Sequence, residues 1–441
     1  MKTAVIGFVL AGLASMAQAG NIFPYAYQKA VLPNKLTVIM IPMPSPGLVA
    51  YYSVVRTGSR DEVEAGKTGF AHFFEHMMFR GTLTYPGPMY DQIVTGIGAD
   101  TNAYTTDDYT AYHLNFARED LETVMKIESD RFQNLSYQKP DFQTEAGAIY
   151  GEFHKSQTSP FFLLEEKIKG LAYEQHTYQH TTMGFEADVK AMPEGYDYSK
   201  SFFQRFYRPD NVVLLIVGDI DPAATLELVK KYYGEWKPGY EAPKVPEEPA
   251  QHGEHTGEVS YPGRTLPILS VAYKGERFDP SQRDYVAAIL LGELAFGSNS
   301  DLYKKLVLND QKVEFIGADI PMNRDTPLFE IDTMVKNVAD IDGVRDEIYR
   351  TIERFQSRPP ESAKLDQVKR RNRYAFAMSL DAPDHVAGHL ARIVALTGDI
   401  EAVEKLYSAF DQVTPEDIQK AARKYFQPER RTVVVLKGAQ G

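Results

Sequence analysis

The segment 68–82 holds three residues that could bind and use a metal ion. His72, Glu75 and His76 form the pattern H-x-x-E-H, with the two histidines four residues apart. Residues at this spacing share one face of a helix, so both imidazoles could bind a single Zn²⁺. Glu75 would then stand beside the metal, where a carboxylate can accept a proton from a bound water molecule. The pattern therefore predicts a catalytic zinc site with His72 and His76 as ligands and Glu75 as the general base.

A catalytic zinc ion also needs a third protein ligand and an open fourth position. The segment 141–154 offers Glu145, Glu152 and His154 as candidates. Glu145 and Glu152 are seven residues apart and share a helical face, whereas His154 points roughly to the opposite side. These residue types and spacings leave the choice among the three open.

The H-x-x-E-H segment, the pair Glu145 and Glu152, and the segment 207–219 closely resemble the pitrilysin/insulinase family of zinc peptidases. The resemblance extends over nearly all of the chain after residue 19. It implies that Glu152, which follows His76 by 76 residues, is the third zinc ligand. It also implies that Glu145 supports the ligands without binding the metal itself.

A second segment of interest, residues 96–112, is rich in threonine and tyrosine with polar alternation, which is typical of a strand or hairpin. The family resemblance implies that it contains the edge strand of the active site. Asn102, Ala103 and Tyr104 would then bind the substrate backbone by strand addition. An ordinary solvent-exposed hairpin is the alternative.

The N-terminal segment 1–19 has the features of a signal peptide. Lys2 precedes the apolar run 4–16, and the run is followed by an A-x-A cleavage site at 17–19. We expect the mature protein to begin at Gly20 and to lie in the periplasm or to be secreted. This run is short for a membrane span and no later run reaches that length, so we expect no membrane anchor.

Composition excludes other classes of protein. The chain has no cysteine, so it forms no disulfide bonds and must be stabilised by burial of its core. Its formal net charge of −12 argues against binding to nucleic acid.

The sequence pattern of the first half recurs near the end of the chain. Residues 207–209 precede the apolar run 212–217, and residues 426–428 precede the apolar run 432–436 in the same way. This recurrence indicates duplication of one unit. The resemblance implies an α+β fold with two homologous halves, each a mostly antiparallel sheet packed with helices.

A polar, proline-rich stretch divides the two halves. It covers residues 238–257 and predicts a linker. We therefore expect a zinc-binding peptidase domain at 20–237 and a homologous domain without the zinc motif at 258–441.

Together these features predict an exported zinc-dependent endopeptidase that cleaves peptides or unstructured polypeptides. One alternative is a dedicated processing peptidase with a single substrate. Another is a peptide-binding subunit without activity, although such a subunit has no need of a general base such as Glu75.

The second half lacks a pair of residues that the family usually carries. Family members have an arginine and a tyrosine, seven residues apart, which face the zinc and bind the carbonyl region of the substrate. In an ungapped match Val307 and Glu314 occupy these positions, and neither donates a hydrogen bond as Arg and Tyr do. The resemblance thus implies a heterodimer with a homologous partner subunit that supplies the pair. A homodimer, or a monomer that uses Lys304, Arg370 or Arg373, is the alternative.

Overall fold

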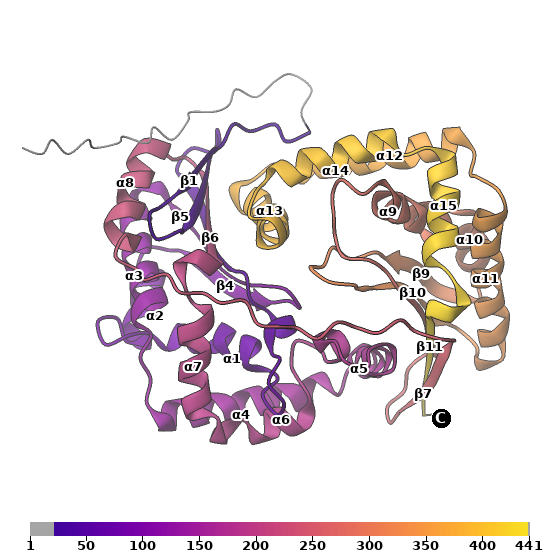
Figure 1. Cartoon of the computed structure of the whole chain (residues 1–441), viewed down its shortest axis with the longest axis horizontal. Coiled ribbons are helices and arrows are strands. Elements are labelled where there is room, and N and C mark those ends of the chain that lie inside the picture. Colours follow the sequence, from indigo (N-terminus) through magenta and orange to yellow (C-terminus); the bar gives the residue numbers. More distant parts are fainter. Residues whose placement is uncertain (1–21, 440–441) are drawn as a thin grey trace, which may run out of the picture.

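The computed structural model describes residues 22–439, so the predicted signal peptide at 1–19 lies outside the described part. Figure 1 shows two halves side by side, each built on one sheet. The strands of the first sheet are β1 (Gln28–Val31), β2 (Thr37–Pro42), β3 (Leu48–Val55), β4 (Asp100–Thr105), β5 (Thr110–Ala117) and β6 (Val212–Gly218). Those of the second sheet are β7 (His255–Tyr261), β8 (Ile268–Lys274), β9 (Val313–Asp319), β10 (Leu328–Val335) and β11 (Arg431–Gly438).

The two sheets share one topology. The first has the strand order β1-β2-β6-β3-β5-β4 and the second the order β7-β11-β8-β10-β9. If β1 is set aside, each strand of the first sheet has a counterpart in the second. Each sheet also has a single parallel pairing, β2 with β6 and β7 with β11, and its other pairings are antiparallel. The predicted fold of two homologous, mostly antiparallel halves is therefore confirmed.

Fifteen α-helices cover these sheets in the described part of the chain. Those of the first half are α1 (Phe70–Met77), α2 (Gly87–Gly96), α3 (Leu121–Asn134), α4 (Lys139–Ser156), α5 (Pro160–Ala172), α6 (Glu186–Ala191), α7 (Tyr196–Phe206) and α8 (Pro222–Tyr233). Those of the second half are α9 (Arg283–Phe296), α10 (Asp301–Tyr303), α11 (Ile341–Ser357), α12 (Ser362–Met378), α13 (Pro383–Thr397), α14 (Glu401–Gln412) and α15 (Pro415–Tyr425).

Strand β6 shows why the sequence has a continuous apolar run at 212–217. Val212, Leu214 and Ile216 belong to the core that contains α1, α3 and α4. Their neighbours Val213, Leu215 and Val217 belong to a separate core on the other face of the sheet. Both faces are covered, so every position of the strand is apolar.

The helix that covers that other face comes from the second half. Helix α13 packs on β3 and β6 of the first sheet, and in return α5 of the first half packs on β7 and β11 of the second sheet (Figure 1). Helix α13 has a clear signal at each end, since it starts at Pro383 and is followed by Gly398, which has a φ of 72°. Each half therefore completes the core of the other.

The linker is shorter and better anchored than the sequence suggests. Strand β7 begins at His255, so the last three residues of the predicted stretch 238–257 belong to the second sheet. Within the linker, the Glu248 carboxylate accepts a hydrogen bond 3.0 Å long from the backbone N–H of His176. It also forms an ion pair of 2.5 Å with the buried Lys274. These contacts fix the linker against both halves.

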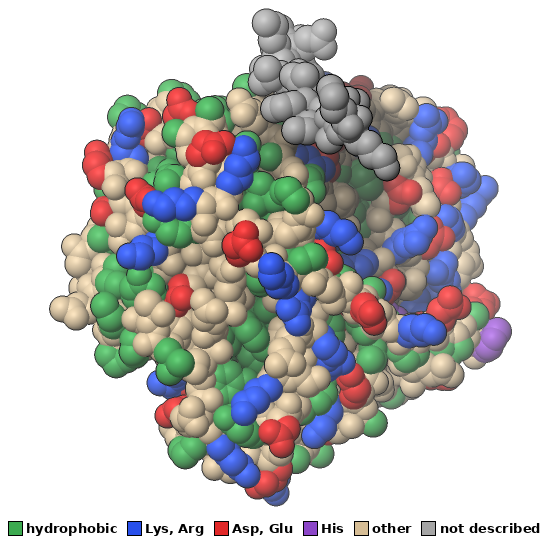
Figure 2. All heavy atoms as spheres, turned by 60° about the vertical axis from the view of Figure 1, so that its left-hand side comes forward, with side chains coloured by type: hydrophobic (Ala, Val, Ile, Leu, Met, Phe, Trp, Pro, Cys, Tyr) green, Lys and Arg blue, Asp and Glu red, His purple; other side chains and the backbone are tan. Residues whose placement is uncertain are grey.

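The surface carries no single-sign patch on the face shown in Figure 2, where acidic and basic side chains are interspersed. The acidic side chains behind the formal net charge of −12 therefore form no single cluster on this face. Within residues 22–439, no helix combines the length and the apolar character that crossing a membrane requires.

Candidate metal centre

Helix α1 presents the H-x-x-E-H residues on its more accessible side and buries its apolar side. Phe70, Phe73, Phe74 and Met77 all lie in the first core. The N-terminus of the helix is capped from a preceding loop, because the Glu62 carboxylate accepts hydrogen bonds from the N–H groups of Gly69 at 2.8 Å and Ala71 at 2.6 Å. This cap and the buried aromatic rings set the rotation of the helix, and with it the direction of its two histidines.

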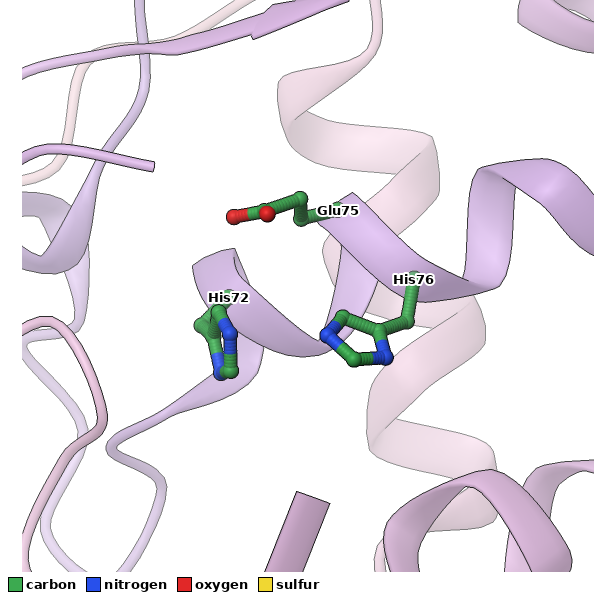
Figure 3. A group of neighbouring side chains, drawn as sticks. All are labelled: His72, Glu75 and His76. Carbon is green, nitrogen blue, oxygen red and sulfur yellow. The ribbon is translucent and has the colours of Figure 1, made fainter. Parts of the chain in front are cut away.

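The structure brings His72, Glu75 and His76 together. Each offers one potential ligand atom, and these atoms lie within 4.8 Å of one another. The two imidazole rings are turned toward each other with their centroids 5.0 Å apart, and Glu75 leaves the helix beside them (Figure 3). One turn of helix separates the rings, as the i,i+4 spacing requires.

Glu152, on α4, approaches both histidines. Its Oε2 atom lies 3.3 Å from Nε2 of His76 and 3.8 Å from Nε2 of His72. Ligand atoms on a tetrahedral zinc ion, with bonds of about 2.0–2.2 Å, lie about 3.3–3.6 Å apart. The distances from Glu152 Oε2 to the two Nε2 atoms are therefore close to those within a zinc ligand set.

Glu145 contacts the other nitrogen of the second histidine. Its Oε1 lies 3.0 Å from Nδ1 of His76, and its Oε2 accepts a hydrogen bond of 2.6 Å from Nε of Arg80. Burial alone would raise the pKa of Glu145, but the hydrogen bonds from His76 and Arg80 lower it, so the carboxyl is ionised. A carboxylate on Nδ1 keeps the proton there and leaves the Nε2 lone pair free for a metal.

The protonation of His72 also fits a metal ligand. Burial lowers the pKa of His72 to about 3, so its ring is neutral, which is the form that binds metals. Within the described residues its buried Nδ1 atom has no hydrogen-bond partner. Two imidazoles and a carboxylate are a donor set that zinc accepts, and the residues present therefore fit this ion.

Glu75 has a partner that holds its carboxylate. The hydroxyl of Thr105, at the end of β4, donates a hydrogen bond of 2.7 Å to Oε2 of Glu75. Burial raises the pKa of Glu75 above its ordinary value of 4.5. A carboxylate with a raised pKa is a stronger base, as proton transfer near neutral pH requires.

Strand β4 borders the site and is the outermost strand of its sheet, paired only with β5. Asn102 and Ala103 line a pocket of about 350 Å³ together with Glu75 and His76. The side chain of Tyr104 lies on the other face of the sheet, where its ring packs edge-on against Tyr109. Of the three residues expected to bind substrate, two line the pocket and Tyr104 offers only its backbone.

Sequence reasoning did not identify Arg80 or Thr105. Arg80 lies four residues after His76, so the helical spacing was a signal that it could share the site. Thr105 gave no such signal, because only the folded strand brings it to Glu75. His154, the third candidate ligand, lies away from the histidines: it is exposed, and its Nδ1 is 3.1 Å from Oε1 of Gln157.

The residues at the expected arginine and tyrosine positions make contacts within their own half. Val307 lies in a π-helical turn, Lys304–Asn309, and packs against the second core. Glu314 is exposed on β9 and lies 3.5 Å from Nζ of Lys336. Arg373, one of the alternative residues, forms an ion pair of 3.0 Å with Asp411.

Comparison with known proteins matches both halves of the chain to one family. Residues 47–186 match the model described as Insulinase (Peptidase family M16), and residues 195–372 match the model described as Peptidase M16 inactive domain. The chain is 25% identical to the zinc protease PqqE of Helicobacter pylori, over 97% of this chain and 96% of that protein. It is 24% identical to the mitochondrial-processing peptidase subunit beta of Lentinula edodes, over 94% of this chain and 90% of that protein.

Solved structures show the same architecture. A protease from Helicobacter pylori superposes with a TM-score of 0.88 and 26% identity, over 94% of this chain and 99% of that one. The periplasmic protease PqqL from Escherichia coli shares the fold with a TM-score of 0.75 and 18% identity, over 96% of this chain and 48% of that one.

Proposed function

The chain belongs to the insulinase (M16) family of peptidases, and on this premise we propose that it is an exported zinc-dependent endopeptidase. Its substrates would be peptides or unstructured polypeptides. The approach of Glu152 Oε2 to Nε2 of both histidines is the observation that carries the proposal. Glu75, beside these atoms, supplies the base.

In this proposal His72, His76 and Glu152 hold Zn²⁺, which would polarise the scissile carbonyl and lower the pKa of a water molecule. Glu75 accepts a proton from the attacking water and later gives it to the leaving amine. Thr105 orients the Glu75 carboxylate.

The remaining residues position the ligands and the substrate. Glu145 holds His76 through Nδ1, so that Nε2 faces Glu152. The free edge of β4, at Asn102, Ala103 and Tyr104, binds the substrate backbone as an added strand.

The variant Glu75→Gln tests the mechanism. It removes the base and keeps the three ligands, so the purified protein should retain zinc and lose nearly all turnover of an unstructured peptide. Glu152→Ala should lose zinc as well, because a ligand is gone. Near-normal turnover by Glu75→Gln would falsify the mechanism.

The place of action is also a proposal. The Escherichia coli protein with the same fold is described as periplasmic, and we propose the periplasm for this chain. Protein recovered from its native host should begin at Gly20. An intact Met1 on cytoplasmic material would contradict this.

A dedicated processing peptidase remains the second candidate function, because the chain resembles a mitochondrial-processing peptidase subunit along most of its length. The chemistry is the same in both cases, and only the range of substrates differs. Digestion of a peptide library distinguishes them: cleavage of many unrelated sequences supports the broad endopeptidase, and cleavage of very few supports the processing enzyme.

We further propose that a homologous partner subunit completes the site. Val307 packs into its own core and Glu314 faces solvent beside Lys336, so neither position supplies a hydrogen-bond donor to a substrate carbonyl. A homodimer is the alternative.

A further inference from the structure

A second pocket, of about 380 Å³, lies between the two halves. Its lining comes from the turn between β4 and β5, from α5, and from β9 and β10 of the second sheet. The turn begins at Thr106, the residue directly after Thr105, whose hydroxyl contacts Glu75. A substrate strand paired with β4 therefore runs toward this pocket as it leaves the candidate metal centre.

Three carboxyl groups lie together on one wall of the pocket. Glu330 and Asp332 are two residues apart on β10, so they project from the same face of the sheet. Asp319 on β9 is the direct cross-strand partner of Glu330. All three line the pocket. Like charges directly opposite each other destabilise a sheet, so this arrangement has a cost unless a positive charge joins it.

Two cations line the pocket, Lys169 and Arg392, and Lys169 partly offsets the effect of burial on the pKa of Glu330. Lys169 forms ion pairs with Asp107 at 3.1 Å and with Glu165 at 3.2 Å. Burial raises the pKa of Asp319 and Arg392 partly opposes this effect, while Nη1 of Arg392 donates to a backbone carbonyl 3.3 Å away. No ion pair to Glu330 or Asp332 is found in the described part of the chain.

The Oδ1 atom of Asp332 supplies independent support for a ligand. This atom is buried, and no hydrogen-bond partner for it occurs within residues 22–439. A buried oxygen without a partner costs about 1–3 kcal/mol, which a bound donor would recover. Burial raises the pKa of both Glu330 and Asp332, and repulsion from neighbouring carboxyls adds to this effect. At Asp332 an interaction with the Ser270 hydroxyl on β8 partly opposes the rise in pKa.

We propose that this pocket binds the cationic side chain of a lysine or arginine in the peptide substrate, with Glu330 and Asp332 as its main partners. The proposal rests on the proposed peptidase function and adds a substrate class to it. Ammonium and guanidinium groups carry both the positive charge and the several N–H donors that the carboxylates lack.

Matched peptides test the proposal. A fluorogenic peptide of neutral residues is compared with a series in which one arginine is moved through successive positions around the scissile bond, and with the same series carrying citrulline. Citrulline keeps the shape of arginine and removes its charge. The protein with zinc bound should cleave one arginine peptide with a kcat/KM about tenfold or more above that of its citrulline counterpart.

The variants Glu330→Gln and Asp332→Asn should abolish this preference and leave kcat/KM for the neutral peptide unchanged. Both remove repulsion between like charges, so they should fold with an equal or higher Tm. Glu258→Gln is the matched control: this carboxylate lies on β7 of the same sheet, pairs with Lys437 outside the pocket, and should keep the preference.

The outcomes separate this proposal from the proposed function. If the neutral peptide is cleaved but arginine and citrulline peptides are equivalent at every position, the subsite is refuted and the peptidase function stands. If no peptide is cleaved by protein that holds zinc, the peptidase function fails. The inactive variant Glu75→Gln then reports on the pocket separately: tighter binding of the arginine peptide than of the citrulline peptide, lost with Glu330→Gln, supports the subsite, and equal binding refutes it.

Discussion

Glu145 and Glu152 contact opposite nitrogens of the same imidazole ring. Glu145 Oε1 lies 3.0 Å from Nδ1 of His76, and Glu152 Oε2 lies 3.3 Å from Nε2. Both glutamates come from one face of α4, two turns apart. A single helix thus carries the group proposed to bind the metal and the group proposed to orient the ligand.

Replacement of Glu145 should weaken zinc binding without removing a ligand. Glu145→Ala should raise the Kd for zinc about 10–100-fold, because Nδ1 of His76 loses the acceptor that fixes its tautomer. Glu145→Gln keeps an oxygen acceptor and should weaken zinc binding less. A zinc-competition titration measures both. Lys155→Gln, on an exposed position of the same helix, is the control, and an unchanged Kd for Glu145→Ala would rule out the orienting role.

Thr105→Val tests the contact to the proposed base. Valine has nearly the shape of threonine but cannot donate the hydrogen bond to Glu75 Oε2. We expect kcat to fall about tenfold, since the base is less well oriented, with zinc content unchanged. Thr101→Val is the control, because its hydroxyl donates to the His113 carbonyl on the neighbouring strand, whereas the Thr105 hydroxyl donates to Glu75. Equal losses in the two variants would mean that β4 itself was disturbed.

An ion pair between the halves should make stability depend on pH. Asp325 of the second half lies 2.5 Å from Nε of Arg60 and 3.0 Å from Nε2 of His176, both in the first half. Burial alone would raise the pKa of Asp325, but hydrogen bonds from His176 and Arg60 lower it well below its ordinary value of 3.8. The folded protein therefore binds this proton less readily than the unfolded chain. The resulting stabilisation is complete above pH 3.8 and is lost as the pH falls through the folded pKa.

Asp325→Asn should accordingly lower the free energy of unfolding at pH 7 by about 1–3 kcal/mol. The difference from the unchanged protein should shrink as the pH falls below about 4. Urea unfolding at a series of pH values measures it. Asp342→Asn removes an exposed carboxylate that pairs with Arg345 one turn away, and should show a much smaller effect. A difference that stays constant down to pH 3 would contradict the proposed charge effect.

The sequence predicted the zinc helix because His72 and His76, at i,i+4 spacing, share one face of a helix whatever the rest of the fold. It could not rank Glu145 against Glu152 by physics alone. Both lie on the same helical face, and what separates them is the nitrogen of His76 that each reaches. That depends on how α4 crosses α1, which spacing within one helix does not encode.

The sequence also could not predict that α5 and α13 each pack on the sheet of the other half. An apolar stripe shows that one side of a helix is buried, but not which sheet buries it. The linker prediction failed for a related reason at 255–257, because polar residues on an outer strand such as β7 resemble those of a loop.

The exchanged helices predict that neither half folds alone. A fragment ending at residue 237 would expose the face of the first sheet that Leu390 and Val394 of α13 cover. A fragment starting at residue 238 would lose Leu164 and Ile168 of α5 from its own sheet. Each should be insoluble or bind a hydrophobic dye.

Cleavage after folding should have the opposite outcome. A protease site placed within 241–247, where the chain has neither helix nor strand, should yield two fragments that elute together on size exclusion. Fragments that separate would show that the exchanged helices do not hold the halves together.

The last prediction concerns the partner subunit. Position 307 carries a valine packed into the second core, and position 314 carries a glutamate on the solvent side of β9. Neither can donate to the oxyanion that develops during cleavage, and loss of one such donor elsewhere typically costs about 10²–10³ in kcat. The chain purified alone with zinc bound should therefore cleave an unstructured peptide slowly. Addition of a homologous chain that lacks H-x-x-E-H but carries the arginine and tyrosine should raise kcat by about 10²-fold or more. Replacement of that arginine in the partner should remove the gain. Full activity of the isolated chain, at concentrations where sedimentation shows a monomer, would refute the heterodimer, and full activity only as a dimer of identical chains would support the homodimer instead.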